Sequence, residues 1–157
     1  MAVIKNKSKV RTYVLAADRA AYEKAKAEGA PRPVVTVFKW RVPSAEFVSG
    51  QELAFVELIE VAKLEGKSLQ GMSEADLLKM IRPEKMASFL DRFKEWCKEC
   101  LVGWSDLNDD EGNAVPFAAG QDGKATDETL AYIQPFWQEL GHAFMAHDEV
   151  TVDELVK

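Results

Sequence analysis

Apolar side chains recur at intervals of three and four residues between Pro83 and about Leu101, and this segment constrains the fold more than any other. The spacing places them on one stripe of an α-helix, with the charged residues mostly on the remaining surface. Burying these side chains contributes about 10–20 kcal/mol, and ordering about twenty residues costs a similar amount. The helix therefore needs other elements to pack against. The stripe consists of Met86, Phe89, Leu90, Phe93, Trp96, Cys97, Cys100 and Leu101.

The segment from Val34 to Val42 has the composition of a β-strand, because β-branched and aromatic side chains favour that conformation. Its residues alternate between an apolar face, which includes Phe38 and Trp40, and a half-apolar face that ends in charge. Residues 11–16 form a second, shorter β-prone stretch. We therefore expect a short N-terminal β element at about 34–42 in a chain that is otherwise mainly helical.

Short local signals predict where the other helices begin. Asp18 can accept hydrogen bonds from the first backbone N–H groups of a helix that follows it. Ser49 and Glu52 have the spacing of a capping box, in which each side chain satisfies a backbone N–H group near the other. Thr126 can cap the last helical region, and Pro135 should kink or restart it.

These patterns predict a mainly α (α+β) fold, with a hairpin-like loop at about 101–117 in addition to the β element at about 34–42. A flexible basic arm at 1–11 precedes a single, compact, mainly helical domain at 12–157, which ends in an acidic C-terminal tail. Residues 118–125 are expected to form a mobile linker before the last helical region.

Charge is distributed unevenly along the chain. Residues 1–41 hold ten Lys and Arg against three Asp and Glu, whereas residues 42–157 hold ten against twenty-three. The net charge of -6 argues against nucleic acid as a partner. A basic arm on an acidic body is either simply solvated or docks on the acidic face of a neighbouring copy, so we expect a homo-oligomer.

The sequence has no segment typical of membrane insertion or secretion. No stretch approaches about 18 consecutive apolar residues, which predicts that membranes are not a partner. The N-terminal residues lack the long apolar region and cleavage site of a secretory signal. The only two cysteines form one closely spaced pair, which gives no disulfide framework. We therefore expect a protein of the cytoplasm.

Cys97 and Cys100 are the first candidates for chemistry. A pair with this spacing can bind zinc, here with His142 and His147 as further ligands, or can carry out thiol–disulfide exchange. Both cysteines lie late in the predicted helix, where the helix dipole disfavours a thiolate, and both lie on the apolar stripe. Core packing is the favoured interpretation, and a small metal-binding regulatory protein is an alternative.

No other pattern indicates an enzyme. The chain has no glycine-rich phosphate loop and no nucleophile elbow. Asp106, Asn108 and Asp110 resemble the start of a calcium loop, but Glu111 and Phe117 stand where that loop requires glycine and glutamate. We expect no catalytic residues and no cofactor.

Residues 101–117 contain a distinctive block, in which an apolar residue and Gly-Trp are followed by Asp-x-x-Gly and then by Pro-Phe. Through this block the chain resembles the tail assembly chaperones of tailed phages, over roughly residues 11–147. The residues of the block are Gly103, Trp104, Asp109, Gly112, Pro116 and Phe117. The upstream residues that fit are Tyr13 to Leu15, Asp18, Arg19 and Thr36 to Phe38.

The resemblance implies a mainly helical, non-enzymatic protein that binds the tape measure protein and keeps it soluble during tail morphogenesis. Such chaperones act in the host bacterial cytoplasm and are absent from the finished virion. They are displaced as tail tube subunits polymerise, which makes the tail tube protein a further partner. The alternative is a structural virion protein, either a head–tail connector or a tail subunit.

A chaperone of this kind needs an apolar groove for a helical client and a charged surface elsewhere. We take Phe136, Trp137, Phe144 and Met145 of the final helical region as candidate client-binding residues, although the same residues would suit a hydrophobic core. The residues of the Gly-Trp block are expected to fix the loop geometry by packing of its Trp, Phe and Pro.

Overall fold

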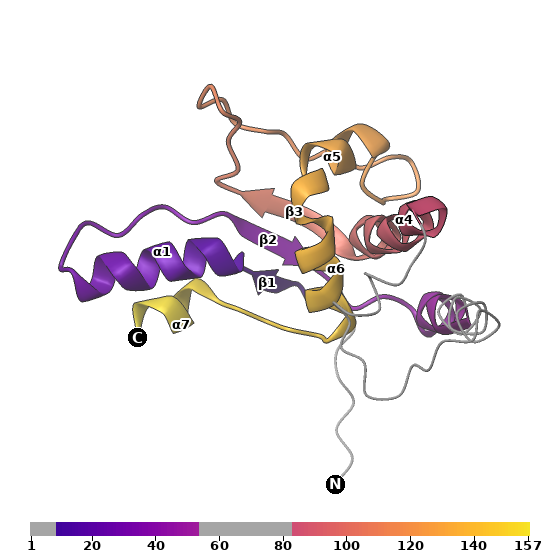
Figure 1. Ribbon diagram of the computed structural model, residues 1–157, viewed down its shortest axis with the longest axis horizontal. Coiled ribbons are helices and arrows are strands. Elements are labelled where there is room, and N and C mark those ends of the chain that lie inside the picture. The colour runs from indigo at the N-terminus through magenta and orange to yellow at the C-terminus, as the bar shows by residue number, and fades with distance from the viewer. Residues whose placement is uncertain (1–8, 54–82) are drawn as a thin grey trace, which may run out of the picture. The chain divides into compact units, whose positions relative to one another are not determined.

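The computed structural model describes residues 9–53 and 83–157, and in the second range it describes side chains from residue 90 onward. The chain divides into two compact units, one formed by Met1–Val42 with Phe93–Lys157 and the other by Pro43–Arg92. The first unit contains a small antiparallel sheet with helices from both ends of its sequence (Figure 1). The fold is mixed α+β and mainly helical, as predicted.

The sheet has three strands in the order β1-β2-β3, with both pairs antiparallel. On the central strand, Phe38 and Trp40 are fully buried whereas Lys39 is exposed, which is the predicted alternation. The strand is shorter than the predicted 34–42, because β1 ends at Tyr13, opposite Phe38, and leaves the preceding residues without that partner. The strands are β1 (Arg11–Tyr13), β2 (Val37–Trp40) and β3 (Leu101–Ser105).

Helix α1 (Ala16–Ala27) follows β1 directly, and the prediction that Asp18 caps it is wrong. The helix begins at Ala16, two residues before Asp18, so Asp18 lies inside its first turn. There its carboxylate accepts a hydrogen bond from the Thr36 N–H at 3.1 Å and connects the helix to the segment before β2. The position still favours an acidic residue, since the N-terminal end of a helix carries partial positive charge.

Helix α4 (Pro83–Cys100) begins at its proline, as predicted, and leads directly into β3. Leu90 is 42% exposed, so its assignment to the buried stripe is wrong. Leu90 belongs to the second unit, which ends at Arg92, and the residues of the first unit resume at Phe93. The side chains of Met86 and Phe89 lie outside the described residues. The buried stripe residues are Phe93, Trp96, Cys97, Cys100 and Leu101.

The last helical region is interrupted at Pro135, as predicted. Helix α5 (Asp127–Tyr132) is followed by the 3-10 helix η1 (Gln134–Phe136), which contains the proline, and then by α6 (Trp137–Met145). The Thr126 side chain accepts a hydrogen bond from the Thr129 N–H, so it caps α5 as expected. Helix α6 contributes buried residues to the core, where the rings of Phe144 and Trp40 lie 4.9 Å apart.

Residues 118–125 form a closed turn, not the predicted mobile linker. Ala119 and Ala125 form an antiparallel bridge, and the Gly120 N–H donates to the Lys124 carbonyl at 2.8 Å. The Lys124 ammonium lies 2.8 Å from the Glu99 carboxylate of α4, which ties the turn to that helix. Glycine and aspartate suited a linker as well as a tight turn, so composition alone did not separate the two.

The acidic C-terminal residues include a short helix, α7 (Val152–Val156). Its Leu155 is buried in a small apolar cluster with Val14, Tyr22 and Val35. Figure 1 shows α7 beside α1, and the two helices are in contact.

In the second unit, residues 45–53 are helical, so the predicted capping box at Ser49 and Glu52 is wrong. The cap is Ser44, whose hydroxyl accepts a hydrogen bond from the Phe47 N–H at 3.2 Å. Ser44 follows Pro43 and lies five residues before Ser49, the predicted cap. Its side chain satisfies a backbone N–H group in the first turn of the helix. The sequence pattern also predicts that this helix continues to about residue 64 and that a short helix begins at Ser73, and both segments lie outside the described residues.

Candidate functional site

The Gly-Trp…Pro-Phe block closes the loop that follows β3. The ring of Trp104 meets the ring of Phe117 edge to face, with centroids 5.1 Å apart. The Trp104 indole N–H donates a hydrogen bond to the Val115 carbonyl at 2.8 Å. Trp104 also contacts Phe38 of β2, at 6.1 Å between centroids. One tryptophan therefore connects the sheet with both the return segment of the loop and the end of the block.

Asp109 organises the tip of the same loop. Its carboxylate accepts hydrogen bonds from the backbone N–H groups of Glu111 and Asn113, at 3.0 and 2.8 Å. Its own N–H donates to the Asn113 carbonyl, and Gly112 adopts a φ of 83°, a conformation that favours glycine. The Asp-x-x-Gly part of the block is thus a turn in which the carboxylate satisfies backbone groups.

The remaining residues of the block make no comparable contact. Gly103 lies in β3 opposite Lys39, and a Cβ atom at this glycine would meet no described atom within 4 Å. Pro116 is exposed, immediately before Phe117. The predicted packing of Trp104 against Phe117 is present, but Pro116, which was predicted to pack with them, is exposed. The hairpin-like loop is shorter than the predicted 101–117, because residues 101–105 pair with β2.

The four candidate client-binding residues are not equivalent. Phe144 is fully buried against Trp40 and belongs to the core of the first unit. Phe136, Trp137 and Met145 are half-buried, so each presents part of its surface to solvent. Tyr132, at the end of α5, is 57% exposed and was not among the predicted residues. We refer to Tyr132, Phe136, Trp137 and Met145 as the apolar set.

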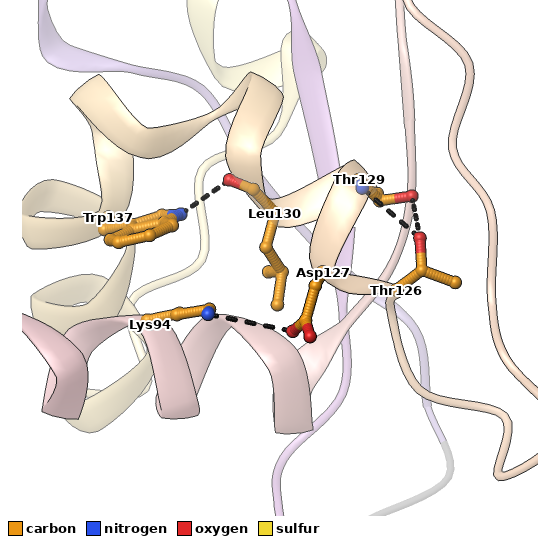
Figure 2. Close-up of polar contacts among 6 residues, drawn as sticks. All are labelled: Lys94, Thr126, Asp127, Thr129, Leu130 and Trp137. Atoms are coloured by element: carbon orange, nitrogen blue, oxygen red, sulfur yellow. Dashed lines mark hydrogen bonds and ion pairs between the residues drawn. The ribbon is translucent and has the colours of Figure 1, made fainter.

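Trp137 is held in place by polar contacts, as Figure 2 shows. Its indole N–H donates a hydrogen bond to the Leu130 carbonyl at 2.8 Å, across the interruption between α5 and α6. The Lys94 ammonium of α4 lies 5.7 Å from the centre of the indole and 3.7 Å from the Asp127 carboxylate. A cation over an indole face is an attractive arrangement. The tryptophan is therefore oriented by the fold while part of its ring stays accessible.

Glu139 is a residue that the sequence patterns did not single out. Its carboxylate accepts hydrogen bonds from the Ala16 N–H at the start of α1 and from the Tyr13 hydroxyl, both at 2.8 Å. Burial, reinforced by Glu139, raises the pKa of Tyr13 to about 12. Glu139 thus caps a helix more than a hundred residues earlier in the chain, which no local spacing could indicate.

The two cysteines lie in the core. Cys97 and Cys100 are fully buried, and burial raises the pKa of each thiol well above its usual range. The Cys97 sulfur lies 3.8 Å from the Trp137 carbonyl, to which its thiol can donate a weak hydrogen bond. A thiol held protonated in this way is a poor nucleophile and a poor metal ligand.

The structure does not bring the proposed zinc ligands together. Within residues 9–53 and 83–157, no three His, Cys, Asp or Glu side chains are grouped closely enough to hold a metal ion. The ring of His142 lies 4.8 Å from that of Phe93, and the ring of His147 lies 6.5 Å from that of Trp40. Both histidines contact aromatic side chains of the core.

Comparison with known proteins identifies no relative, because no family model, curated protein or solved structure matches the chain. None of the helices in the described part of the chain is both long enough and apolar enough to cross a membrane.

Proposed function

We propose that the protein is a phage tail assembly chaperone, which binds the tape measure protein and keeps it soluble in the host cytoplasm. The proposal starts from the resemblance carried by Gly103, Trp104, Asp109, Gly112, Pro116 and Phe117. The observation that supports it best is the apolar set, since aromatic and methionine side chains stay partly exposed where a helical client could pack.

Most of the core of the first unit lies outside the apolar set, of which Phe136 packs against the buried ring of Phe38 at 6.4 Å between centroids. Phe38, Trp40, Phe93 and Phe144 are all at most 1% exposed, as are Leu130 of α5 and Leu140 of α6. An exposed tyrosine or a half-exposed tryptophan is therefore not required to fill a gap inside the unit. Large apolar side chains that adjoin one another at a surface are typical of binding sites for other proteins.

Charge on the rest of the molecule suits the same role. Residues 42–157 carry more than twice as many acidic as basic residues, which keeps a complex with an apolar client hydrated. The proposal involves no catalytic step and no cofactor.

The experiment is co-expression with the tape measure protein of the same phage, followed by purification of the soluble complex. Replacing Tyr132 and Met145 by glutamate places charge within the apolar set without removing a fully buried side chain. We expect this double variant to stay folded by circular dichroism and to lose the soluble complex. The matched control is Val34→Glu, because Val34 is apolar, 79% exposed and outside the set.

Retention of the complex by the double variant, or equal loss in the Val34→Glu control, would contradict the proposal. Tyr132→Glu alone serves as the second variant if the double variant unfolds, because that side chain is already 57% exposed. Mass spectrometry of purified particles separates the chaperone from a structural virion protein, since only the chaperone is absent from the finished particle.

A further inference from the structure

The C-terminal residues 148–157, which we call the strap, are hydrogen-bonded to β1 and α1. The Val150 N–H donates to the Thr12 carbonyl, and the Thr12 hydroxyl donates to the Val150 carbonyl, both at 2.9 Å. The strap thereby occupies the edge of β1 that does not pair with β2. Edges of this kind readily accept a strand from another chain.

A single buried side chain anchors the rest of the strap. Leu155 is 5% exposed and lies in the cluster of Val14, Tyr22 and Val35, while Val156 beside it is 61% exposed. Lys26 of α1 donates a hydrogen bond to the Leu155 carbonyl at 3.5 Å. Helix α7 has five residues, too few to be stable without these contacts. The strap is therefore a small element whose order depends on the surface beneath it.

The strap and this surface also have opposite charge. The strap contains four acidic residues and one lysine, whereas residues 9–32 contain twice as many basic as acidic residues. Lys9 and Glu149 form an ion pair at 3.8 Å across the boundary. Charge and shape thus favour the contact between the strap and residues 9–32, whether the two segments belong to one copy of the chain or to two.

The connection between α6 and the strap is short and turns sharply at His147. His147 has a φ of 56°, in the left-handed region that favours glycine, and only two residues separate it from Val150. The turn is closed by a hydrogen bond from the Asp148 N–H to the Ala143 carbonyl at 2.8 Å. Extension of the chain at this point opens the left-handed turn, and a short hinge loop favours exchange of the segment that follows.

From these four observations we infer that the strap is exchanged between two copies of the chain, so that each copy's β1 edge and apolar cluster hold the strap of the other. Every contact that the strap makes with β1, α1 and the apolar cluster is made equally well between two chains, so the interaction lost on exchange is confined to the hydrogen bonds of the turn at His147. An unfilled site is unfavourable, because Val14, Tyr22 and Val35 would be exposed. The exchange provides a specific route to a homodimer and does not depend on client binding.

The test uses two full-length variants, Thr12→Cys and Val150→Cys, whose backbones are hydrogen-bonded to each other at these positions. The two chains are unfolded, mixed, refolded with a reducing agent and oxidised only after folding. The native Cys97 and Cys100 are then fully buried and do not compete. We expect a disulfide-linked heterodimer that requires both variants, and its share should rise with the protein concentration used for refolding.

Each variant refolded and oxidised alone is the control for accidental coupling of surface thiols. The double variant Thr12→Cys/Val150→Cys reports whether the two positions meet in the folded protein, because it should become fully cross-linked. If the double variant closes only within single chains and the mixture gives no heterodimer at any concentration, the exchange does not occur. Failure of the double variant to form any cross-link would also overturn the proposal.

Discussion

Gly141 lies where α6 packs against α4, and the space for its side chain is already filled. A Cβ atom at this position would lie 2.7 Å from Cδ1 of Phe93 and 3.2 Å from its Cα. Distances this short require a shift of the aromatic ring and of the α4 backbone, which is costly in a packed core. The glycine permits the two helices to approach each other, although glycine is otherwise unfavourable inside a helix.

We therefore predict that Gly141→Ala lowers the free energy of unfolding. Overpacking costs about 1–3 kcal/mol, which outweighs the roughly 1 kcal/mol gained from the better helix propensity of alanine. Urea unfolding measures the difference. Gly50→Ala is the matched control, because Gly50 is also helical and meets no described atom within 4 Å, so there the propensity gain should dominate. Equal effects of the two substitutions would contradict the packing argument.

Tyr13 gives the stability of the protein a defined dependence on alkaline pH. Its pKa is about 12 in the folded protein against an ordinary value of 10.0, so the folded state holds the phenol proton more tightly. Unfolding therefore releases this proton between pH 10 and 12. The stabilising contribution is complete below pH 10 and is lost as the pH rises through this window.

We expect Tyr13→Phe to remove this part of the alkaline loss of stability, as measured by denaturant unfolding at a series of pH values. Glu139→Gln should lower the pKa of Tyr13, because it replaces the carboxylate that accepts a hydrogen bond from the hydroxyl with a neutral amide. Ultraviolet titration of the phenol measures that pKa directly. An unchanged titration curve in Glu139→Gln would show that the carboxylate does not affect the phenol.

At the scale of elements, the loop after β3 depends on one side chain. Trp104 donates a hydrogen bond to the Val115 carbonyl and packs on both Phe38 and Phe117. We predict that Trp104→Phe speeds hydrogen exchange at the Asp109 and Val115 amides, which are hydrogen-bonded inside the loop. Loss of the indole hydrogen bond should destabilise the closed loop by about 1 kcal/mol. The fraction of molecules in which the loop is locally open should rise accordingly.

Trp137→Phe is the matched control for this loop. Trp137 likewise donates one indole hydrogen bond, to the Leu130 carbonyl, but it lies in the α5–α6 region. Its replacement should leave exchange at the loop amides unchanged. If both substitutions speed exchange at Asp109 and Val115 alike, the effect is a general loss of stability and not a property of the loop.

Elements with local signals could be predicted, and contacts across the sequence could not. The period of the α4 stripe, the Thr126 cap and the break at Pro135 each depend on residues a few positions apart. The pairing of β2 with β3 joins segments about sixty residues apart. Because no local pattern indicates this pairing, β3 was predicted only as part of the hairpin-like loop. Asp18 and Ser49 were suitable as caps but lay inside helices, because the chain supplied other caps.

In the candidate site, too, local contacts could be predicted and contacts between distant segments could not. The contact between Trp104 and Phe117 could be expected from their spacing in the block. The sequence did not distinguish Phe144, which is buried, from Phe136, Trp137 and Met145, which are half-buried, because all four lie on one kinked helical segment. Only the position of the sheet decides which of these side chains reaches the core.

At the scale of the whole molecule, two surfaces are assigned to two different partners. The apolar set is proposed to hold the client, and the β1–α1 surface is inferred to hold the strap of a second copy. The two sets of residues do not overlap, so a dimer joined through its straps still presents two apolar sets. This arrangement would allow one dimer to engage two segments of a long helical client, which strengthens binding through effective concentration.

The most direct measurement is site-specific photo-cross-linking in cells that co-express the chain with its proposed client, a tape measure protein. A photoreactive phenylalanine replaces Tyr132, whose side chain is 57% exposed, or Val34, which is 79% exposed and outside the apolar set. We predict cross-links to the tape measure protein from position 132 and none from position 34. A soluble complex that gives no cross-link from position 132, or equal cross-links from both positions, would contradict the assignment of the client to the apolar set.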